Sequence, residues 1–399
     1  MSLTLSPDWL HWPETQALVR AFKAAPGDVR FVGGCVRDAV LGRSAEDIDL
    51  ATTHKPEQVM ALLKAAGITV IPTGLKHGTV TAAINRRRFE ITTLRRDTAC
   101  DGRHAEVAFT DDWEADAKRR DFTMNALFLT SGGELFDYTD GAGDAKAGRV
   151  RFIGDAGERV REDYLRILRF FRFFAQYGRH APDTQALAAC RAHAEGLDQI
   201  SGERIQHEMF KLLAADNPLY ALCLMRDCGI LARLIPETHG MPALERLPEM
   251  EQTLRAQAEP ETKLALLLPP EQLEAVAARW KLANATREII ARLHHWLPQM
   301  ESLTGDVCAQ KKTLRALGIT PYTQLALMAA AGAEDAAHYA DMLKLADGWS
   351  PPEFPVTGHD LLAMGKEENA ELGRDLKKLE ALWEESDYKL SRGELLKLL

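Results

Sequence analysis

The sequence predicts an α+β fold, in which a small mixed α/β domain is followed by a long all-helical remainder. Residues 28–140 alternate short β-like runs with helical stretches, whereas from about residue 160 the apolar residues keep a helical spacing. A chain of 399 residues is long enough for several domains, each with its own core. We therefore expect domains over 1–145, 146–236 and 237–399.

The first domain is expected to contain short strands with helices between them. Apolar or alternating runs bounded by turn residues predict strands over 30–32, 47–51, 79–84 and 88–94. The last two read as a pair joined by a turn at 85–87. Helices are predicted over 36–41 and from Lys55-Pro56-Glu57 onward, because proline is favoured at the first position of a helix.

The remainder of the chain shows helical periodicity throughout. Apolar residues over 165–174 form one helical stripe. Further helices are predicted over 184–196, 201–215, 218–229, 246–257, 271–281, 284–297, 308–316, within 322–347, and over 358–365 and 367–385. Prolines at 236, 269–270 and 351–352 indicate breaks, so this part is expected to be a series of helical domains.

Composition places the chain among ordinary soluble globular proteins, with 46% hydrophobic and 27% charged residues. No apolar run is long enough for a membrane span, and the N-terminus lacks a secretory signal, so we expect a cytoplasmic protein. Six scattered cysteines without a CxxC pair favour free thiols. The net charge is −9, yet arginines cluster within 86–96, 119–120 and 149–179, which would permit an RNA-facing groove.

A glycine pair and a later pair of aspartates carry the strongest chemical signal. Gly33 and Gly34 let the backbone approach a ligand and point N–H groups at it, as phosphate-binding loops do. Asp47 and Asp49 alternate with Ile48 in a predicted strand, so both carboxylates face one side, roughly 6–7 Å apart. Such a pair suits two Mg²⁺ ions about 3.5–4 Å apart, the arrangement for in-line phosphoryl displacement. These features predict nucleotidyl transfer.

Two further motifs narrow the class of nucleotidyl-transfer protein that the sequence resembles. Lys118-Arg-Arg-Asp-Phe-Thr-Met-Asn-Ala-Leu127 places basic, acidic and amide groups ahead of an apolar strand. Arg161-Glu-Asp-Tyr-Leu-Arg-Ile-Leu-Arg169 is predicted to open a helix with Asp163 and Arg166 on one face. With these ordered motifs the chain resembles the class II tRNA nucleotidyltransferases (CCA-adding enzymes) and bacterial poly(A) polymerases. The resemblance implies a polymerase-β-type nucleotidyltransferase head, a mixed sheet with helices, followed by all-α neck, body and tail domains.

The resemblance also implies roles for particular residues. Asp47 and Asp49 would be catalytic and would hold Mg²⁺, with Glu90 as the candidate third carboxylate; the alternative for Glu90 is a solvent-facing strand residue. The other implied nucleotide contacts are Gly33, Gly34, Arg37 and Arg120 near the phosphates, and Asp121 and Asn125 at the ribose.

Asp163 and Arg166 would act as a protein template for the incoming base. A carboxylate accepts from the exocyclic amine that cytosine and adenine carry, and a guanidinium donates to the neighbouring ring acceptor. Uracil presents a carbonyl to the carboxylate instead, and guanine presents the wrong edge. The alternative for this pair is a surface salt bridge on a helix.

The activity implied is template-independent addition or repair of the CCA sequence at the tRNA 3′ end, with CTP and ATP. Residues 74–81 resemble the CCA-adding version of their motif, and residues 94–104 fill the position of a flexible loop that CC-only enzymes lack. A poly(A) polymerase, an A-adding enzyme and an inactive RNA-binding protein remain alternatives. The helices of 237–399 would bind tRNA; no protein partner is indicated.

Some bacterial relatives also carry a phosphohydrolase domain marked by an adjacent His-Asp pair. The pair in this chain, His359-Asp360, lies in Thr357-Gly-His-Asp-Leu, which reads as the start of a helix. We therefore expect no phosphohydrolase domain.

Overall fold

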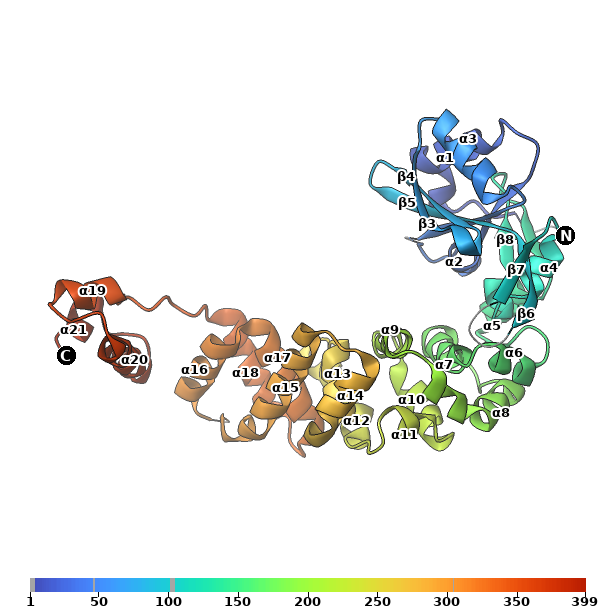
Figure 1. The fold of residues 1–399 in the computed structure, drawn as a ribbon. Helices are drawn as coiled ribbons and strands as arrows, with labels where there is room; N and C mark the ends of the chain where they lie inside the picture. Colours follow the sequence, from blue (N-terminus) through green and yellow to red (C-terminus); the bar gives the residue numbers. More distant parts are fainter. Residues whose placement is uncertain (1–3, 46, 101–104, 304) are drawn as a thin grey trace. The chain divides into compact units, whose positions relative to one another are not determined.

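The computed structural model describes residues 4–45, 47–100, 105–303 and 305–399, with 97–100 and 105–107 described by their backbone alone (Figure 1). The chain divides into two compact units, Met1–Pro236 and Glu237–Leu399, called here the N-terminal and C-terminal units. A mixed sheet followed by helices confirms the predicted α+β fold class. Within the described residues no helix is long and apolar enough to cross a membrane.

The N-terminal unit is built on a sheet of seven strands among the described residues, in the order β3-β4-β5-β2-β1-β8-β9. β2 and β5 are parallel, and every other neighbouring pair is antiparallel. The strands are β1 (Val29–Val32), β2 (Ile48–Thr52), β3 (Thr69–Gly74), β4 (Thr79–Ile84), β5 (Arg87–Thr93), β8 (Leu127–Leu129) and β9 (Leu135–Asp137).

The predicted hairpin over 79–94 is confirmed, with Asn85 at positive φ in its turn. β3 was not predicted, and the structure shows why. It lies at the edge of the sheet and contains Pro72, a residue that cannot donate to a ladder and is tolerated at edges. The predicted strand over 47–51 begins one residue later, so Asp47 precedes β2.

A separate two-stranded sheet pairs β6 (Arg95–Cys100) with β7 (Ala105–Phe109). The predicted flexible loop over 94–104 therefore includes one strand, and residues 101–104 of it lie outside the described residues. Its role stays a prediction.

Five α-helices surround the strands of the head: α1 (Pro13–Phe22), α2 (Gly34–Val40), α3 (Pro56–Ala65), α4 (Trp113–Lys118) and α5 (Gly141–Ala147). The core between sheet and helices buries Leu18, Phe31, Val36, Ile48 and Phe89 almost completely. Burying such side chains contributes about 1.5–3 kcal/mol each, so the strand that carries Asp49 is held by its apolar neighbours.

The rest of the N-terminal unit is helical. Its α-helices are α6 (Ala156–Glu162), α7 (Leu165–Tyr177), α8 (Thr184–Ala192), α9 (Gly202–Leu213), α10 (Pro218–Asp227) and α11 (Ile230–Leu234). α7 packs against both α9 and α10, and this burial explains its many apolar residues, among which Phe170 and Phe171 are fully buried.

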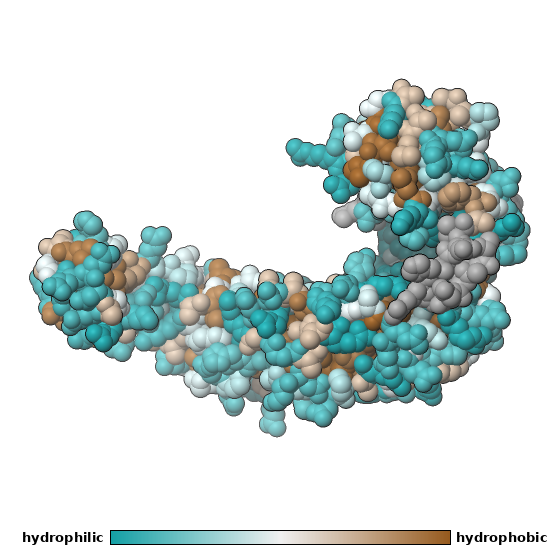
Figure 2. Space-filling view, viewed as in Figure 1, coloured by the Kyte–Doolittle hydropathy of each residue, from teal (hydrophilic) through white to brown (hydrophobic). Residues whose placement is uncertain are grey.

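The C-terminal unit contains helices and connecting segments, and no strand among its described residues. Its α-helices are α12 (Met241–Leu254), α13 (Pro260–Leu267), α14 (Leu273–Trp280), α15 (Asn284–Trp296), α16 (Val307–Leu317), α17 (Ile319–Gly332), α18 (Ala337–Gly348), α19 (Gly358–Ala363), α20 (Ala370–Glu385) and α21 (Arg392–Leu396). His359 and Asp360 lie in the first turn of α19, where Asp360 accepts from the N–H of the N-cap residue Thr357 and pairs with Arg392. The visible face of this unit is mostly hydrophilic (Figure 2).

Candidate active site

Three carboxylates line one pocket beside the β2 and β5 strands. The parallel register places Asp49 directly beside Glu90, and side chains in register point to the same side of a sheet. Asp47, Asp49 and Glu90 line one pocket of 480 Å³. Ile48 between the aspartates is buried in the core, as the alternation predicted. The structure thus brings together the three residues predicted to be catalytic; their roles stay predictions.

The carboxylates affect one another electrostatically. Burial, together with the neighbouring charges of Glu90 and Asp47, raises the pKa of Asp49 to about 6, although Arg120 opposes the shift. A cluster of like charges in a partly buried place is costly unless a cation compensates it. The pocket is therefore suited to bind positive charge.

Asp47 and Asp49 have the oxygen donors that hard divalent cations prefer. Among the described residues no three His, Cys, Asp or Glu side chains converge in a metal-binding group. The two aspartates would therefore hold a metal ion whose coordination is completed by water or substrate oxygens, which is how Mg²⁺ is commonly bound at phosphate-transfer sites. The donor set fits such an ion.

We expect Asp49→Asn to stabilise the metal-free protein at neutral pH. Because the folded-state pKa of Asp49 is about 6 and the ordinary value is 3.8, ionisation of this carboxyl destabilises the fold progressively as the pH rises from 3.8, and the full cost is present above about pH 6. The substitution should raise the free energy of unfolding by about 1–3 kcal/mol at pH 7.5 and by little at pH 4. Thermal unfolding in EDTA at both pH values measures this. Glu57→Gln, at an exposed carboxylate on α3, serves as the control, and an equal gain at both pH values would refute the assignment.

The glycine turn lies between β1 and α2. Gly33 has a φ of 75°, a conformation that L-residues rarely adopt, and it precedes the first turn of α2. A Cβ atom added at Gly33 would lie 3.9 Å from Arg120 Nη1, and one added at Gly34 would lie 3.6 Å from Arg37 Nη2. The turn therefore lies close to both arginines predicted to bind phosphate.

Both of these arginines also have protein partners. Arg37, only 7% exposed, donates to both carboxylate oxygens of Asp38 and, through Nη1, to Asn125 Oδ1 at 2.7 Å. Arg120 donates from Nε and Nη2 to Asp116 Oδ2 at 3.2 and 2.9 Å. These partners fix the two guanidinium groups in place beside the turn.

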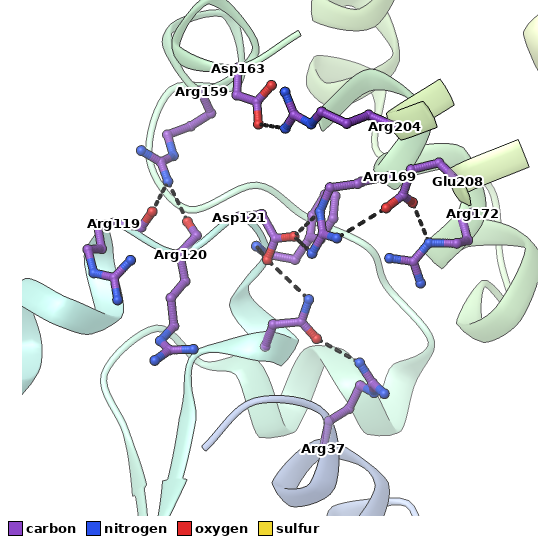
Figure 3. A network of polar contacts seen from close by, with 12 residues as sticks. Arg37, Arg119, Arg120, Asp121, Arg159, Asp163, Arg169, Arg172, Arg204 and Glu208 are labelled. Carbon is purple, nitrogen blue, oxygen red and sulfur yellow. Dashed lines mark hydrogen bonds and ion pairs between the residues drawn. The ribbon is translucent and has the colours of Figure 1, made fainter. Parts of the chain in front are cut away.

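Asp121 and Asn125 belong to a polar network that links the sheet to α7 and α9 (Figure 3). Asn125 Nδ2 donates to Asp121 Oδ1 at 3.1 Å, and Arg169 Nε donates to Asp121 Oδ2 at 2.8 Å. Burial would raise the pKa of Asp121, but Arg169 and Asn125 outweigh it and hold this pKa below its usual value. Both carboxylate oxygens of Asp121 thus accept hydrogen bonds from protein donors. A ribose hydroxyl at the predicted contact would have to share these oxygens with them.

Arg169 continues this network and was not predicted to be functional. It pairs with Glu208, which also accepts from Arg172 Nε at 2.5 Å. A cation recurs at every third position along α7, at Arg166, Arg169 and Arg172. This helical spacing is the sequence signal that could have identified Arg169. The carboxylate partner, on α9, is 36 residues away from Arg172, and nothing local indicates that pairing.

The prediction that Asp163 and Arg166 share one helix face is wrong. α6 ends at Glu162 and α7 begins at Leu165, so Asp163 lies in the junction with extended backbone angles. Its Oδ1 accepts from the Leu165 N–H at 3.1 Å, an example of an aspartate side chain that competes with helix continuation. Its Oδ2 accepts from Arg204 Nη2 at 2.7 Å, and Arg166 pairs with Glu162 instead.

A second pocket, of 550 Å³, is lined both by predicted site residues and by residues of the helices. Gly34, Arg37, Asp47 and Asp49 line it together with residues of α7 and α9. Asp163 and Arg166 line neither this pocket nor the pocket of Glu90. The structure thus gathers the glycine turn and the aspartates around one cavity, and places the predicted base-recognition pair at the α6–α7 junction.

Comparison with known proteins identifies the parts of this chain. Residues 29–151 match a family model described as the poly A polymerase head domain, and residues 181–241 match one described as a probable RNA and SrmB-binding site of polymerase A. In solved structures, the CCA-adding enzyme of Bacillus stearothermophilus in complex with CTP is similar, with a TM-score of 0.74 and 27% identity over 94% of this chain and 93% of that one.

Relatives extend this similarity over nearly the whole length. The mitochondrial CCA tRNA nucleotidyltransferase 1 of Danio rerio is 36% identical and covers 96% of this chain and 89% of its own sequence. The human counterpart is 35% identical and covers 96% of this chain and 88% of its own sequence. A CCA-adding enzyme of Latilactobacillus sakei is 34% identical over 76% of each protein. At this identity and coverage, the chain belongs to the family of CCA-adding tRNA nucleotidyltransferases.

Proposed function

We propose that this protein adds or repairs the CCA sequence at the 3′ end of tRNA, using CTP and ATP as substrates and no nucleic-acid template. The observation that carries the proposal is the shared cavity of the glycine turn and the Asp47–Asp49 pair. Membership in a family whose members are named for CCA addition supports it.

The proposed chemistry depends on positioning and charge and needs no covalent intermediate. The backbone at Gly33 and Gly34, with Arg37 and Arg120 beside it, would bind the triphosphate. Asp47 and Asp49 would hold Mg²⁺, which supplies charge neutralisation and activates the RNA 3′-hydroxyl, with Glu90 adding a third carboxylate. Metal dependence is general in this family; Mg²⁺ as the specific ion is our proposal.

Asp121 and Asn125 would act at the ribose side of the nucleotide, where an RNA enzyme must recognise the 2′-hydroxyl. Since Asp121 accepts from Arg169 and Asn125, we propose that it orients Asn125 and Arg169. Asp163 and Arg166 would recognise the base. Because Arg204 holds Asp163 and Glu162 holds Arg166, we propose that the nucleotide meets two side chains already oriented by ion pairs.

We also propose the larger organisation predicted from the sequence: a head over 1–145, a neck over 146–236, and a body and tail over 237–399 that bind tRNA and lack a phosphohydrolase domain. A cytoplasmic location is consistent with the free thiols of Cys35, Cys190, Cys228 and Cys308. Three relatives are named as mitochondrial, so fractionation of the source cell is the direct measurement.

The decisive experiment offers a tRNA that ends before CCA, with Mg²⁺ and single nucleotides or mixtures. We expect two residues added with CTP alone and three with CTP and ATP, read on sequencing gels. Extension with ATP only after CC is already present would identify an A-adding enzyme. Long adenylate tails on unrelated RNA would identify a poly(A) polymerase, and RNA binding without extension would identify an inactive protein.

A further inference from the structure

The cavity that contains Asp47 and Asp49 has a second wall made by α7 and α9. Arg172, Gln176 and Tyr177 contribute from α7, and Lys211 contributes from α9. This wall lies in the same compact unit as the aspartates. Arg172 and Lys211 lie outside the motifs on which the family resemblance rests, so those motifs assign them no role in the reaction.

Arg172 is held by a buried carboxylate. Glu208 is only 3% exposed, and its two oxygens accept from Arg169 and Arg172 (Figure 3). Arg172 also lies over the Phe173 ring, 4.3 Å from the centroid. Within the described residues its hydrogen bond to Glu208 uses Nε, and Nη1 and Nη2 make none. A guanidinium fixed in this way can donate from its outer nitrogens to a ligand in the cavity.

Lys211 lines the same wall of the cavity, and its charge is available to a ligand. It is exposed, and among the described residues its ammonium group forms no ion pair. By contrast, Arg37, which also lines this cavity, is occupied by Asp38 and Asn125. Arg172 and Lys211 are therefore the cations of this cavity with donors left for a ligand.

The charge pattern identifies the chemistry of that ligand. Asp47 and Asp49 repel any polyanion that approaches them, and a phosphate group must nevertheless reach them for nucleotidyl transfer. Cations lining the same cavity would offset that repulsion and position the anion, since guanidinium and ammonium groups bind phosphate through charge-assisted hydrogen bonds.

We infer that Arg172 and Lys211 form a phosphate-binding subsite in the cavity that Asp47 and Asp49 also line, with Glu208 as the positioning residue that orients Arg172. The phosphate comes from one of two sources, the backbone of the RNA acceptor near its 3′ end or the triphosphate of the incoming nucleotide. The assignment of the reaction rests on the proposed function, whereas the subsite itself rests on the cavity and its charges.

The test compares Lys211→Ala with the wild type in steady-state kinetics, with tRNA lacking CCA and with CTP varied separately. We expect KM for tRNA to rise about three- to tenfold, KM for CTP to stay unchanged, and the slope of log Kd for tRNA against log salt to fall in magnitude by about 0.7 for one lost phosphate contact. Lys64→Ala, at an exposed lysine on α3, should change none of these values.

Glu208→Gln tests the positioning role. It keeps the shape of the side chain and removes the charge that fixes Arg172, so we expect the same KM to rise as with Lys211→Ala, with kcat changed less. Asp144→Asn is the matched control, because Asp144 is also a fully buried carboxylate with two arginine partners, Arg149 and Arg151, and lines neither pocket. Circular dichroism verifies that each variant is folded.

Each outcome has a defined meaning. A rise in KM for tRNA supports the subsite with an RNA phosphate, and a rise in KM for CTP alone supports it with the triphosphate. If Lys211→Ala changes neither constant nor the salt slope, the subsite is refuted. Should the wild type fail to extend any tRNA, the proposed function fails, while the salt dependence of tRNA and CTP binding still tests the subsite.

Discussion

Asp49→Asn is expected to lower kcat for nucleotide addition by at least about a thousandfold. A metal ion at such a site contributes several kilocalories per mole of transition-state stabilisation, and about 4 kcal/mol corresponds to a thousandfold rate. Asn keeps the shape of Asp but removes the negative charge that would hold the ion beside Asp47. Single-turnover addition of CMP to a tRNA lacking CCA, under saturating CTP and Mg²⁺, measures the loss.

Two comparisons make this result specific. The affinity for tRNA should remain within about twofold of wild type, because the aspartate would contact the metal and not the RNA. The same Asn variant is expected to unfold at a higher temperature in EDTA, so loss of folding cannot explain its inactivity. Activity retained to within tenfold would refute the metal-ligand assignment of Asp49.

Asp163→Ala is expected to reduce the selection of C and A over U and G by about tenfold to a hundredfold. An unpaired hydrogen-bonding group costs about 1–3 kcal/mol, and the wrong base incurs this cost only while the carboxylate is present. The ratio of kcat/KM for CTP to that for UTP should therefore fall in the variant. Competition between the two nucleotides on one tRNA measures the ratio directly.

Asp163 Oδ1 also accepts from the N–H of Leu165, the first residue of α7, so loss of this hydrogen bond has a structural cost of about 1 kcal/mol that must be separated from base choice. Asp155→Ala is the control, because Asp155 caps α6 through the N–H of Glu158 and lines neither pocket. It should lower stability by a similar amount and leave the CTP-to-UTP ratio unchanged. An unchanged ratio in Asp163→Ala would show that another residue selects the base.

The local patterns of the head could be read without a structure. Alternation around Ile48 predicted that the two flanking aspartates face away from the core, and the buried Ile48 agrees. The hairpin over 79–94 followed from its alternation and its turn. β3 escaped prediction because Pro72 and a half-exposed edge give it little strand character of its own. Its stability comes from pairing with β4.

The α6–α7 junction shows a limit of periodicity. Counting residues placed Asp163 and Arg166 on one helix, since three positions apart is nearly one turn. An aspartate can also end one helix and cap the next, and the choice depends on what surrounds it. Arg204 from α9 supplies a partner for Asp163 only when the helices are packed together.

By itself, the sequence determined the hairpin over 79–94, the glycine turn and the pair of aspartates, because turn residues and alternation act over a few neighbouring positions. Only the tertiary structure set Glu90 beside Asp49 and placed both aspartates in a cavity faced by Arg172 and Lys211. It also paired Asp121 with Arg169 and Arg172 with Glu208. Ion pairs and pKa values depend on distances between residues far apart in the chain, and those distances exist only after folding.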